Sequence, residues 1–207
     1  MEKIRIKPLV HKYNDKEPYF NQLIEALCNV HSSYLQYETY KYKGDKLVPV
    51  IKRAERVFAY ELYHQYRLLM HNNENYKLNG EIFKDNNIFQ SKEVSSCYPD
   101  LVLHNNLGFI DDNSQYFLCE IKMSSNRELV NDLYKLTELR TFTKLDFKYY
   151  IFLCVGLNLN ALRKRILNNR SSDDNRKLSG DIVCICRKKD NIEVFELKEI
   201  VPQELLL

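Results

Sequence analysis

The chain has 207 residues, of which 44% are hydrophobic and 29% charged, and its formal net charge is +3. A chain of this length can bury a sizeable core, and we expect one domain over residues 1–207. The composition is that of an ordinary soluble globular protein, and the small net charge does not by itself indicate nucleic-acid binding. The opening segment MEKIRIKPLV is too short and too charged for a signal peptide or a membrane span. We therefore expect a cytoplasmic protein with no membrane partner.

The six cysteines form no CxxC pair and have no histidine partners at zinc-site spacing. They are Cys28, Cys97, Cys119, Cys154, Cys184 and Cys186. The last four lie in apolar, strand-like runs, as small buried hydrophobic side chains do. We therefore expect reduced thiols in a cytosolic protein rather than a disulfide framework.

The first half of the chain carries two helical patterns followed by three strand patterns. Apolar and aromatic residues recur at helical spacing over residues 18–40 and again over 50–70, which predicts two helices. Segments 76–84, 100–105 and 116–123 are short, and Gly, Pro, Asn or Asp residues bound them. These three segments are predicted to be strands.

The second half alternates helices with strands and ends in a hairpin. The predicted elements are a helix over 125–141, a strand over 148–156, a helix over 159–169 and a hairpin over 181–199. Ser125 and Glu128 stand at capping-box spacing before the first of these helices. The strand is apolar almost throughout, as a strand covered on both faces would be. The whole order predicts an α/β domain with a mixed sheet.

Charged residues lie inside two of the predicted strands, where burial is costly. Pro99-Asp100 opens one strand, and Glu120-Ile121-Lys122 stands near the end of the next. Side chains alternate along a strand, so Glu120 and Lys122 point to the same face. Symmetric pairing of the two strands would place Asp100 opposite Ile121, one residue from Glu120. We therefore expect a bulge or an asymmetric loop between these strands.

Two carboxylates and an ammonium at one end of neighbouring strands form a candidate site for a hard cation. Mg²⁺ is usually held by one or two carboxylates, with water and phosphate oxygens completing its coordination. In such a site Asp100 and Glu120 would bind the metal ion. Lys122 would orient a water molecule and offset the negative charge that develops during attack on phosphorus.

Pro99-Asp100 is followed by Glu120-Ile121-Lys122, with Glu120 twenty positions after Asp100. This arrangement resembles the PD-(D/E)xK signature of restriction-endonuclease-like nucleases. The order of elements over residues 50–156 also resembles the αβββαβ core of that family. An extra N-terminal helix and a C-terminal β-hairpin lie outside the resemblance. Members commonly carry a further glutamate on the first core helix, which makes Glu55 the favoured metal ligand and Glu61 the second choice. Glu81 could also join the metal site, since some members place an acid on the first core strand.

The resemblance implies an Mg²⁺-dependent nuclease, with Mn²⁺ as a substitute ion. DNA is favoured over RNA because most relatives of this shape cut DNA, which is an analogy. The alternative is a nuclease-like, non-catalytic binding or structural subunit of a defence or mobile-element complex. A homodimer would suit double-strand cutting, although no sequence feature predicts one.

Other charged residues have simpler explanations. Nine Lys or Arg residues between residues 162 and 189 could follow a phosphate backbone, although a solvated helix and loop would carry the same charge. A second acid-and-lysine arrangement, Asp181 followed by Glu196 and Lys198, lacks the proline and is too close to the C-terminal end of the chain for the rest of the core. Asp132 and Lys135 follow the Glu-x-Lys strand on a helix whose leucine stripe predicts that they are exposed. Polar groups of that helix reach the edge of the site in similar nucleases.

Overall fold

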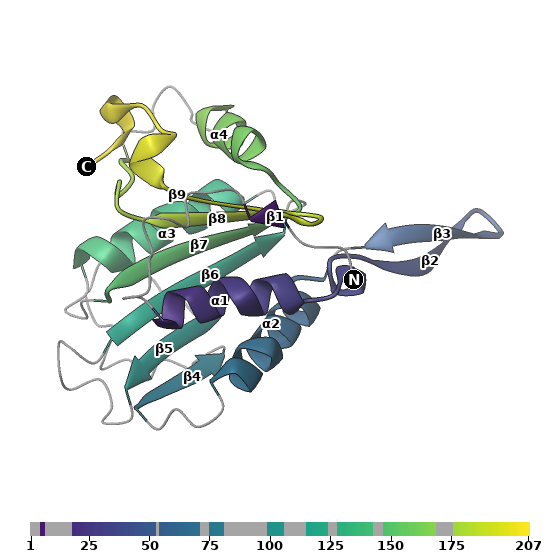
Figure 1. Cartoon of the computed structure of the whole chain (residues 1–207). Helices are drawn as coiled ribbons and strands as arrows, with labels where there is room; N and C mark the ends of the chain where they lie inside the picture. The colour runs from purple at the N-terminus through teal and green to yellow at the C-terminus, as the bar shows by residue number, and fades with distance from the viewer. Residues whose placement is uncertain are drawn as a thin grey trace.

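A mixed β-sheet lies between two layers of helices in the computed structural model of the chain (Figure 1). The structure describes residues 5–6, 18–52, 54–70, 75–80, 99–105, 115–123, 128–142, 147–168 and 176–207. This arrangement confirms the predicted mixed α/β class. No helix in these ranges is long and apolar enough to cross a membrane.

The main sheet has seven strands in the order β1-β9-β8-β7-β6-β5-β4 within the described ranges. The strands are β1 (Arg5–Ile6), β4 (Tyr76–Gly80), β5 (Leu101–Asn105), β6 (Gln115–Met123), β7 (Tyr149–Val155), β8 (Val183–Lys188) and β9 (Asn191–Glu196). Strands β6, β7 and β8 run parallel, whereas β4–β5, β5–β6 and β8–β9 are antiparallel pairs. The parallel strands therefore all end at one edge of the sheet.

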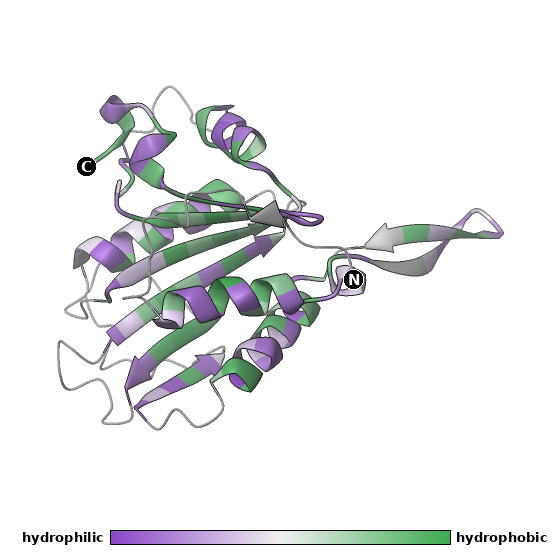
Figure 2. Ribbon diagram, in the orientation of Figure 1, coloured by the Kyte–Doolittle hydropathy of each residue, from purple (hydrophilic) through white to green (hydrophobic). Residues whose placement is uncertain are grey.

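Within the described ranges, two helices cover each face of the sheet. They are α1 (Pro18–Asn29) and α2 (Glu55–Leu69) on one face, and α3 (Leu129–Phe142) and α4 (Leu159–Asn168) on the other. Short 3₁₀ turns are η2 (Ser32–Tyr34), η4 (Leu197–Glu199) and η5 (Gln203–Leu205). Strand β7 is buried along almost its whole length, as its apolar sequence predicts, and it is mostly green in Figure 2. Each face of the sheet thus has its own apolar core.

The order α2, β4, β5, β6, α3 and β7 matches the helix, three-strand, helix, strand order expected over residues 50–156. The described elements start or end a few residues from the predicted boundaries. The last four residues of the predicted strand 76–84 lie outside the described ranges, as does the capping segment 125–127. The C-terminal hairpin is present as β8 and β9, and it completes the main sheet beside β7.

The prediction of helix for residues 30–40 and 50–52 is wrong. Helix α1 ends at Asn29 instead of continuing to residue 40, and a two-stranded hairpin precedes α2. Its strands are β2 (Tyr37–Lys43) and β3 (Lys46–Lys52). Gly44 has a φ of 63° and supplies the left-handed conformation that this tight turn needs. The segment YETYKYK has three tyrosines and a threonine among its seven residues, a composition that favours a strand and that could have predicted this hairpin.

The predicted irregularity between β5 and β6 is confirmed. Leu101 pairs with Cys119 and Leu103 with Phe117, but His104 pairs with Gln115. The extra residue on β6 shifts the register by one. Continued beyond Leu101, this register places residue 100 opposite residue 120. The bulge therefore brings the two carboxylates of the sequence motif together.

Candidate acid and lysine site

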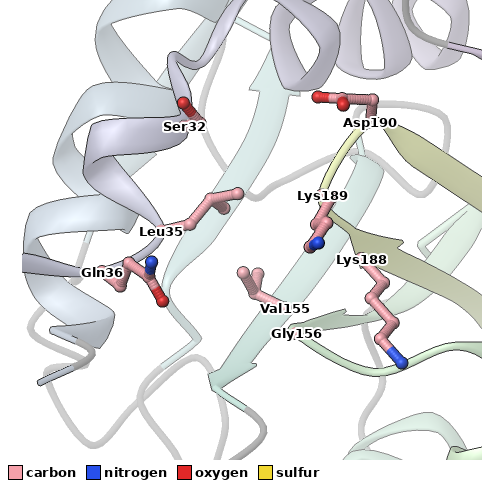
Figure 3. Close-up of a pocket in the computed structure, with 8 residues that line it drawn as sticks. All are labelled: Ser32, Leu35, Gln36, Val155, Gly156, Lys188, Lys189 and Asp190. Carbon is pink, nitrogen blue, oxygen red and sulfur yellow. The ribbon is translucent and has the colours of Figure 1, made fainter. Parts of the chain in front are cut away.

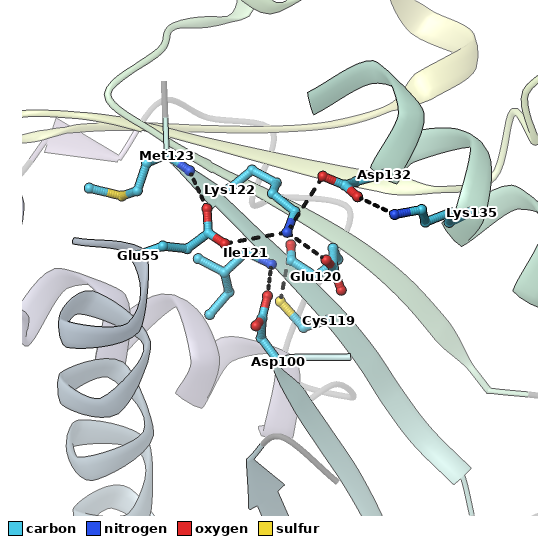
Figure 4. A network of polar contacts seen from close by, with 9 residues as sticks. All are labelled: Glu55, Asp100, Cys119, Glu120, Ile121, Lys122, Met123, Asp132 and Lys135. Atoms are coloured by element: carbon cyan, nitrogen blue, oxygen red, sulfur yellow. Dashed lines mark hydrogen bonds and ion pairs between the residues drawn. The ribbon is translucent and has the colours of Figure 1, made fainter. Parts of the chain in front are cut away.

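Lys122 lies at the centre of a cluster of carboxylates near the end of β6 (Figure 4). Its Nζ atom is 2.8 Å from Glu120 Oε1, 3.3 Å from Glu55 Oε1 and 3.5 Å from Asp132 Oδ2. The partners come from β6, α2 and α3, so both helical layers reach this one strand end. We call Glu55, Asp100, Glu120, Lys122 and Asp132 the acid–lysine cluster.

Asp100 joins the cluster through the backbone of β6. Strand β5 begins at Leu101, so the last residues of β6 extend past their antiparallel neighbour. Asp100 Oδ2 accepts a hydrogen bond from the Ile121 N–H at 2.6 Å. Glu55 Oε2 accepts one from the Met123 N–H at 3.1 Å. Two carboxylates thus satisfy backbone donors at an open strand edge, where unpaired donors would be costly.

Glu55 is the first residue of α2, which explains why it can reach β6. A carboxylate in the first turn of a helix is favoured by the positive end of the helix dipole. Between Lys122 and the Met123 N–H, both of its oxygens have partners. Glu61 was the second candidate for the metal-binding glutamate of this helix. It accepts a hydrogen bond from Gln65, one turn further along α2. The structure therefore brings Glu55, and not Glu61, into contact with the motif lysine.

Asp132 is a member of the cluster that the leucine stripe of α3 did not predict. It is buried, and its two oxygens contact Lys122 and Lys135, the latter at 3.1 Å. Lys135 is 44% exposed and lies at the rim. The signal in the sequence was the position of this acid in the first turn of the helix that follows the Glu-x-Lys strand. Its burial follows from the packing of α3 on β6, which periodicity alone does not reveal.

The charges in the cluster keep Lys122 protonated. Burial by itself would lower the pKa of Lys122, but the charges of Glu120, Glu55 and Asp132 outweigh burial and raise that pKa above its ordinary value. Burial raises the pKa of Glu120, and the charge of Lys122 and its hydrogen bond oppose this effect. Lys122 is therefore an ammonium at neutral pH, suited to stabilising negative charge and unsuited to accepting a proton.

Asp100 titrates near neutral pH. Burial, followed by the charge of Glu120, raises the pKa of Asp100 to about 7, although the hydrogen bond from the Ile121 N–H and the charge of Lys122 act in the opposite direction. A second positive charge beside Asp100 and Glu120 would favour the ionised form of both carboxylates. The site thus carries more negative charge than Lys122 alone can stabilise in the ionised state.

The donor set fits a hard cation held by two carboxylates. Glu120 Oε2 is buried and has no hydrogen-bond partner among the described residues. A buried, unpaired carboxylate oxygen beside Asp100 is a suitable ligand for Mg²⁺ or Mn²⁺. Within the ranges that the structure describes, no three His, Cys, Asp or Glu side chains form a group that could hold a metal ion. Water and substrate oxygens commonly complete the coordination of such an ion.

Two further candidates from the sequence are Glu81 and His104. Glu81 lies outside the described residues, so its predicted place in the metal site stays a prediction. His104 is 2.6 Å from the Asn79 amide and 2.7 Å from the Asn105 carbonyl oxygen. These contacts give His104 a role at the β4–β5 edge of the sheet.

The second acid-and-lysine arrangement is spread over separate contacts. Asp181 bonds to Ser179 and Arg140, whereas Glu196 and Lys198 form an ion pair with each other. Arg187, one of the nine basic residues, is 1% exposed and donates hydrogen bonds to the Leu27 and Val30 carbonyl oxygens. Arg187 therefore holds the end of α1 on the sheet and cannot be part of an external basic face.

A pocket of about 350 Å³ lies where strand β7 ends (Figure 3). Its lining comes from the η2 segment, the end of β7 and the β8–β9 turn, and includes Ser32, Leu35, Gln36, Val155, Gly156, Lys188, Lys189 and Asp190. Val155 pairs with Met123, whose N–H donates to Glu55. The pocket and the cluster are thus one strand apart.

Known proteins add no guide to function beyond the fold and the cluster of the described residues. Comparison with models of known protein families, with curated proteins and with solved structures finds no match in any of the three. The chemistry of the site must therefore carry the functional argument.

Proposed function

We propose that this chain is a metal-dependent nuclease that hydrolyses phosphodiester bonds, in DNA in preference to RNA. The observation that supports this proposal is the convergence of Asp100, Glu120 and Lys122, with Glu55, at one edge of a mixed sheet. These are the residues and the order of elements in which the chain resembles PD-(D/E)xK nucleases. The preference for DNA follows from that resemblance.

Asp100 and Glu120 would hold Mg²⁺, or Mn²⁺ in its place. The bound ion would supply a Lewis acid that offsets charge on the phosphate and makes a water molecule nucleophilic at neutral pH. Glu120 Oε2 has no competing hydrogen bond among the described residues. Asp100 would lose its proton when the ion binds, because its pKa lies near 7 in the absence of the ion.

Lys122 would stabilise the transition state. Its ammonium is held near Glu120 by contacts with Glu55 and Asp132, so little reorganisation is needed when negative charge develops on the phosphate. Glu55 is thus a positioning residue for Lys122 in this mechanism. Glu81 stays a candidate for the same acidic site.

One set of contacts favours a second function, that of a non-catalytic, nuclease-like binding subunit. Lys122 already has three carboxylate neighbours, and Asp100 and Glu55 both bond to backbone N–H groups. These contacts would stabilise the sheet edge whether or not a metal ion binds. In that case the chain itself would hydrolyse no phosphodiester bond, with or without metal ions. Any cleavage in the preparation would not change when residues of the cluster are substituted.

A cleavage assay separates the two functions. The purified chain is incubated with supercoiled plasmid, linear duplex DNA, single-stranded DNA and single-stranded RNA, in Mg²⁺, in Mn²⁺ and in EDTA. We expect cleavage of DNA with either metal ion and none in EDTA. Glu120→Gln and Lys122→Gln should each lower the rate by about 100-fold or more, since each removes a charge used in the transition state.

The chain supplies its own matched controls for this assay. Glu196→Gln and Lys198→Gln change the same residue types at the same spacing, in an ion pair remote from the cluster in sequence and outside its contacts. Both controls should cleave at the wild-type rate. Cleavage that survives both cluster substitutions would come from a contaminating enzyme. Absence of cleavage on all four substrates, with no Mg²⁺ or Mn²⁺ binding by calorimetry, would favour the binding subunit.

A further inference from the structure

The β2–β3 hairpin projects from the body of the molecule (Figure 1). One face carries Tyr40 and Tyr42, opposite Pro49 and Leu47 on the neighbouring strand. These side chains are well exposed, with Tyr42 at 75% and Tyr40 at 59%. An exposed row of two aromatic rings and a leucine needs an explanation, because large apolar side chains are normally covered.

The opposite face of the hairpin is basic. Lys41 and Lys43 alternate with the two tyrosines, and Lys46 pairs with Lys43 across the turn. All three lysines are exposed. Residues 37–52 contain four lysines and two acids, so the hairpin carries a net positive charge. A ring face and a cationic face on one ribbon suit a polyanion that also has flat apolar surfaces.

The hairpin is connected directly to both parts of the site. Gln36, which lines the pocket, is the residue before β2. Glu55, which contacts Lys122, stands three residues after the end of β3. The hairpin thus begins at the pocket and ends at the acid–lysine cluster. A chain molecule held on the hairpin would approach both.

We propose that the β2–β3 hairpin binds a single-stranded stretch of nucleic acid and guides it to the acid–lysine cluster. Tyr40 and Tyr42 would stack on unpaired bases, while Lys41, Lys43 and Lys46 would contact phosphates. A single strand is specified because stacking on a side chain requires bases that are free of their own neighbours. This proposal rests on the proposed nuclease function, of which it specifies the substrate.

Binding is measured separately from cleavage, in EDTA, by fluorescence anisotropy of end-labelled 12-nucleotide strands and of the matching duplexes, as DNA and as RNA. Tyr42→Ala should weaken binding of the single strand by about tenfold, the loss expected for one stacked base. Lys41→Gln combined with Lys43→Gln should reduce the slope of log K against log salt by about 1.4, the value for two phosphate contacts on a single strand.

Matched controls come from other exposed residues of the same types. Tyr60 is 60% exposed on α2, and Lys77 is exposed on β4. Tyr60→Ala and Lys77→Gln should leave both the affinity and the salt slope at their wild-type values. Circular dichroism of each variant checks that the fold is retained.

Several outcomes would overturn the hairpin proposal without touching the nuclease proposal. These are unchanged single-strand affinity in Tyr42→Ala, a loss confined to the duplex, or no binding of any strand by the wild-type chain. Sedimentation could instead show that wild type is a dimer and that Tyr42→Ala is a monomer with unchanged affinity for the single strand. That result would assign this face to contact with a second copy of the chain. Failure of the nuclease proposal is detected independently, by the metal-dependent cleavage assay.

Discussion

Glu55 Oε1 lies 3.3 Å from Lys122 Nζ, and Glu55 Oε2 accepts a hydrogen bond from the N–H of Met123. This one side chain therefore joins the first turn of α2 to the end of β6, across 67 residues of sequence. It fixes the lysine head group on one side, while Asp132 contacts it from α3. The lysine that would act in hydrolysis is thus held by elements on both faces of the sheet.

Replacing Glu55 tests this link. Glu55→Gln keeps an acceptor for the Met123 N–H but removes the charge that faces Lys122. Because Glu55 is about one-third exposed, the free energy of unfolding should fall by only about 1 kcal/mol. Urea denaturation provides the measurement. Glu61→Gln, on the same helix, is the control and should stay within about 0.5 kcal/mol of wild type. Equal losses in the two variants would contradict a specific role for Glu55.

Replacing Lys122 should destabilise the protein in a pH-dependent way. Lys122→Met leaves Glu120 and Asp132 buried without their shared cation, which costs about 3 kcal/mol at neutral pH. The pKa of Glu120, already raised by burial, then rises further in the folded state, so the folded protein takes up a proton that the unfolded chain does not. Stability relative to wild type should therefore improve as the pH falls from 8 to 5. Thermal unfolding of both proteins, followed by circular dichroism at these pH values, measures this difference. A loss of stability that does not change with pH would contradict the prediction.

The raised pKa of Asp100 should make the stability of the metal-free protein depend on pH. Its pKa is raised from 3.8 to about 7 in the folded state, so between these values the folded protein binds the extra proton. Stability should consequently fall as the pH rises from about 4 to about 7. Asp100→Asn keeps an acceptor for the Ile121 N–H and cannot ionise. At pH 8 in EDTA it should be more stable than wild type by about 4 kcal/mol, with little difference at pH 4. Denaturation curves in which Asp100→Asn is less stable at pH 8 would refute this assignment.

Because Arg187 is buried and hydrogen-bonded, we expect its replacement to lower the free energy of unfolding substantially. Arg187→Met removes two hydrogen bonds, at 2.5 and 2.6 Å, to the carbonyl oxygens of Leu27 and Val30 near the end of α1. These acceptors would then be buried without a charged donor, at a cost of about 3 kcal/mol. Lys188→Met alters the exposed neighbour and should change stability by less than about 0.5 kcal/mol. Guanidinium denaturation compares the two, and similar values would contradict the buried role of Arg187.

The sequence determined the local geometry of the motif. Alternation along a strand required Glu120 and Lys122 to share a face, and the spacing of Asp100 required a one-residue shift that the β5–β6 bulge supplies. The apolar run of β7 and the helical patterns likewise placed most elements of the main sheet. Such features follow from the period of the backbone, which any short segment carries in its own sequence.

The packing of helices and strands far apart in sequence brings further groups to that motif. Asp132 is buried against Lys122 because α3 packs on β6, although its helix alone predicts an exposed position. Arg187 looked like part of a basic surface until the packing of α1 covered it. The β2–β3 hairpin was hidden by tyrosines whose spacing also suits a helix, and pairing between two segments decided in favour of strands. Contacts between elements far apart in sequence depend on how whole layers pack, and no local pattern encodes that arrangement.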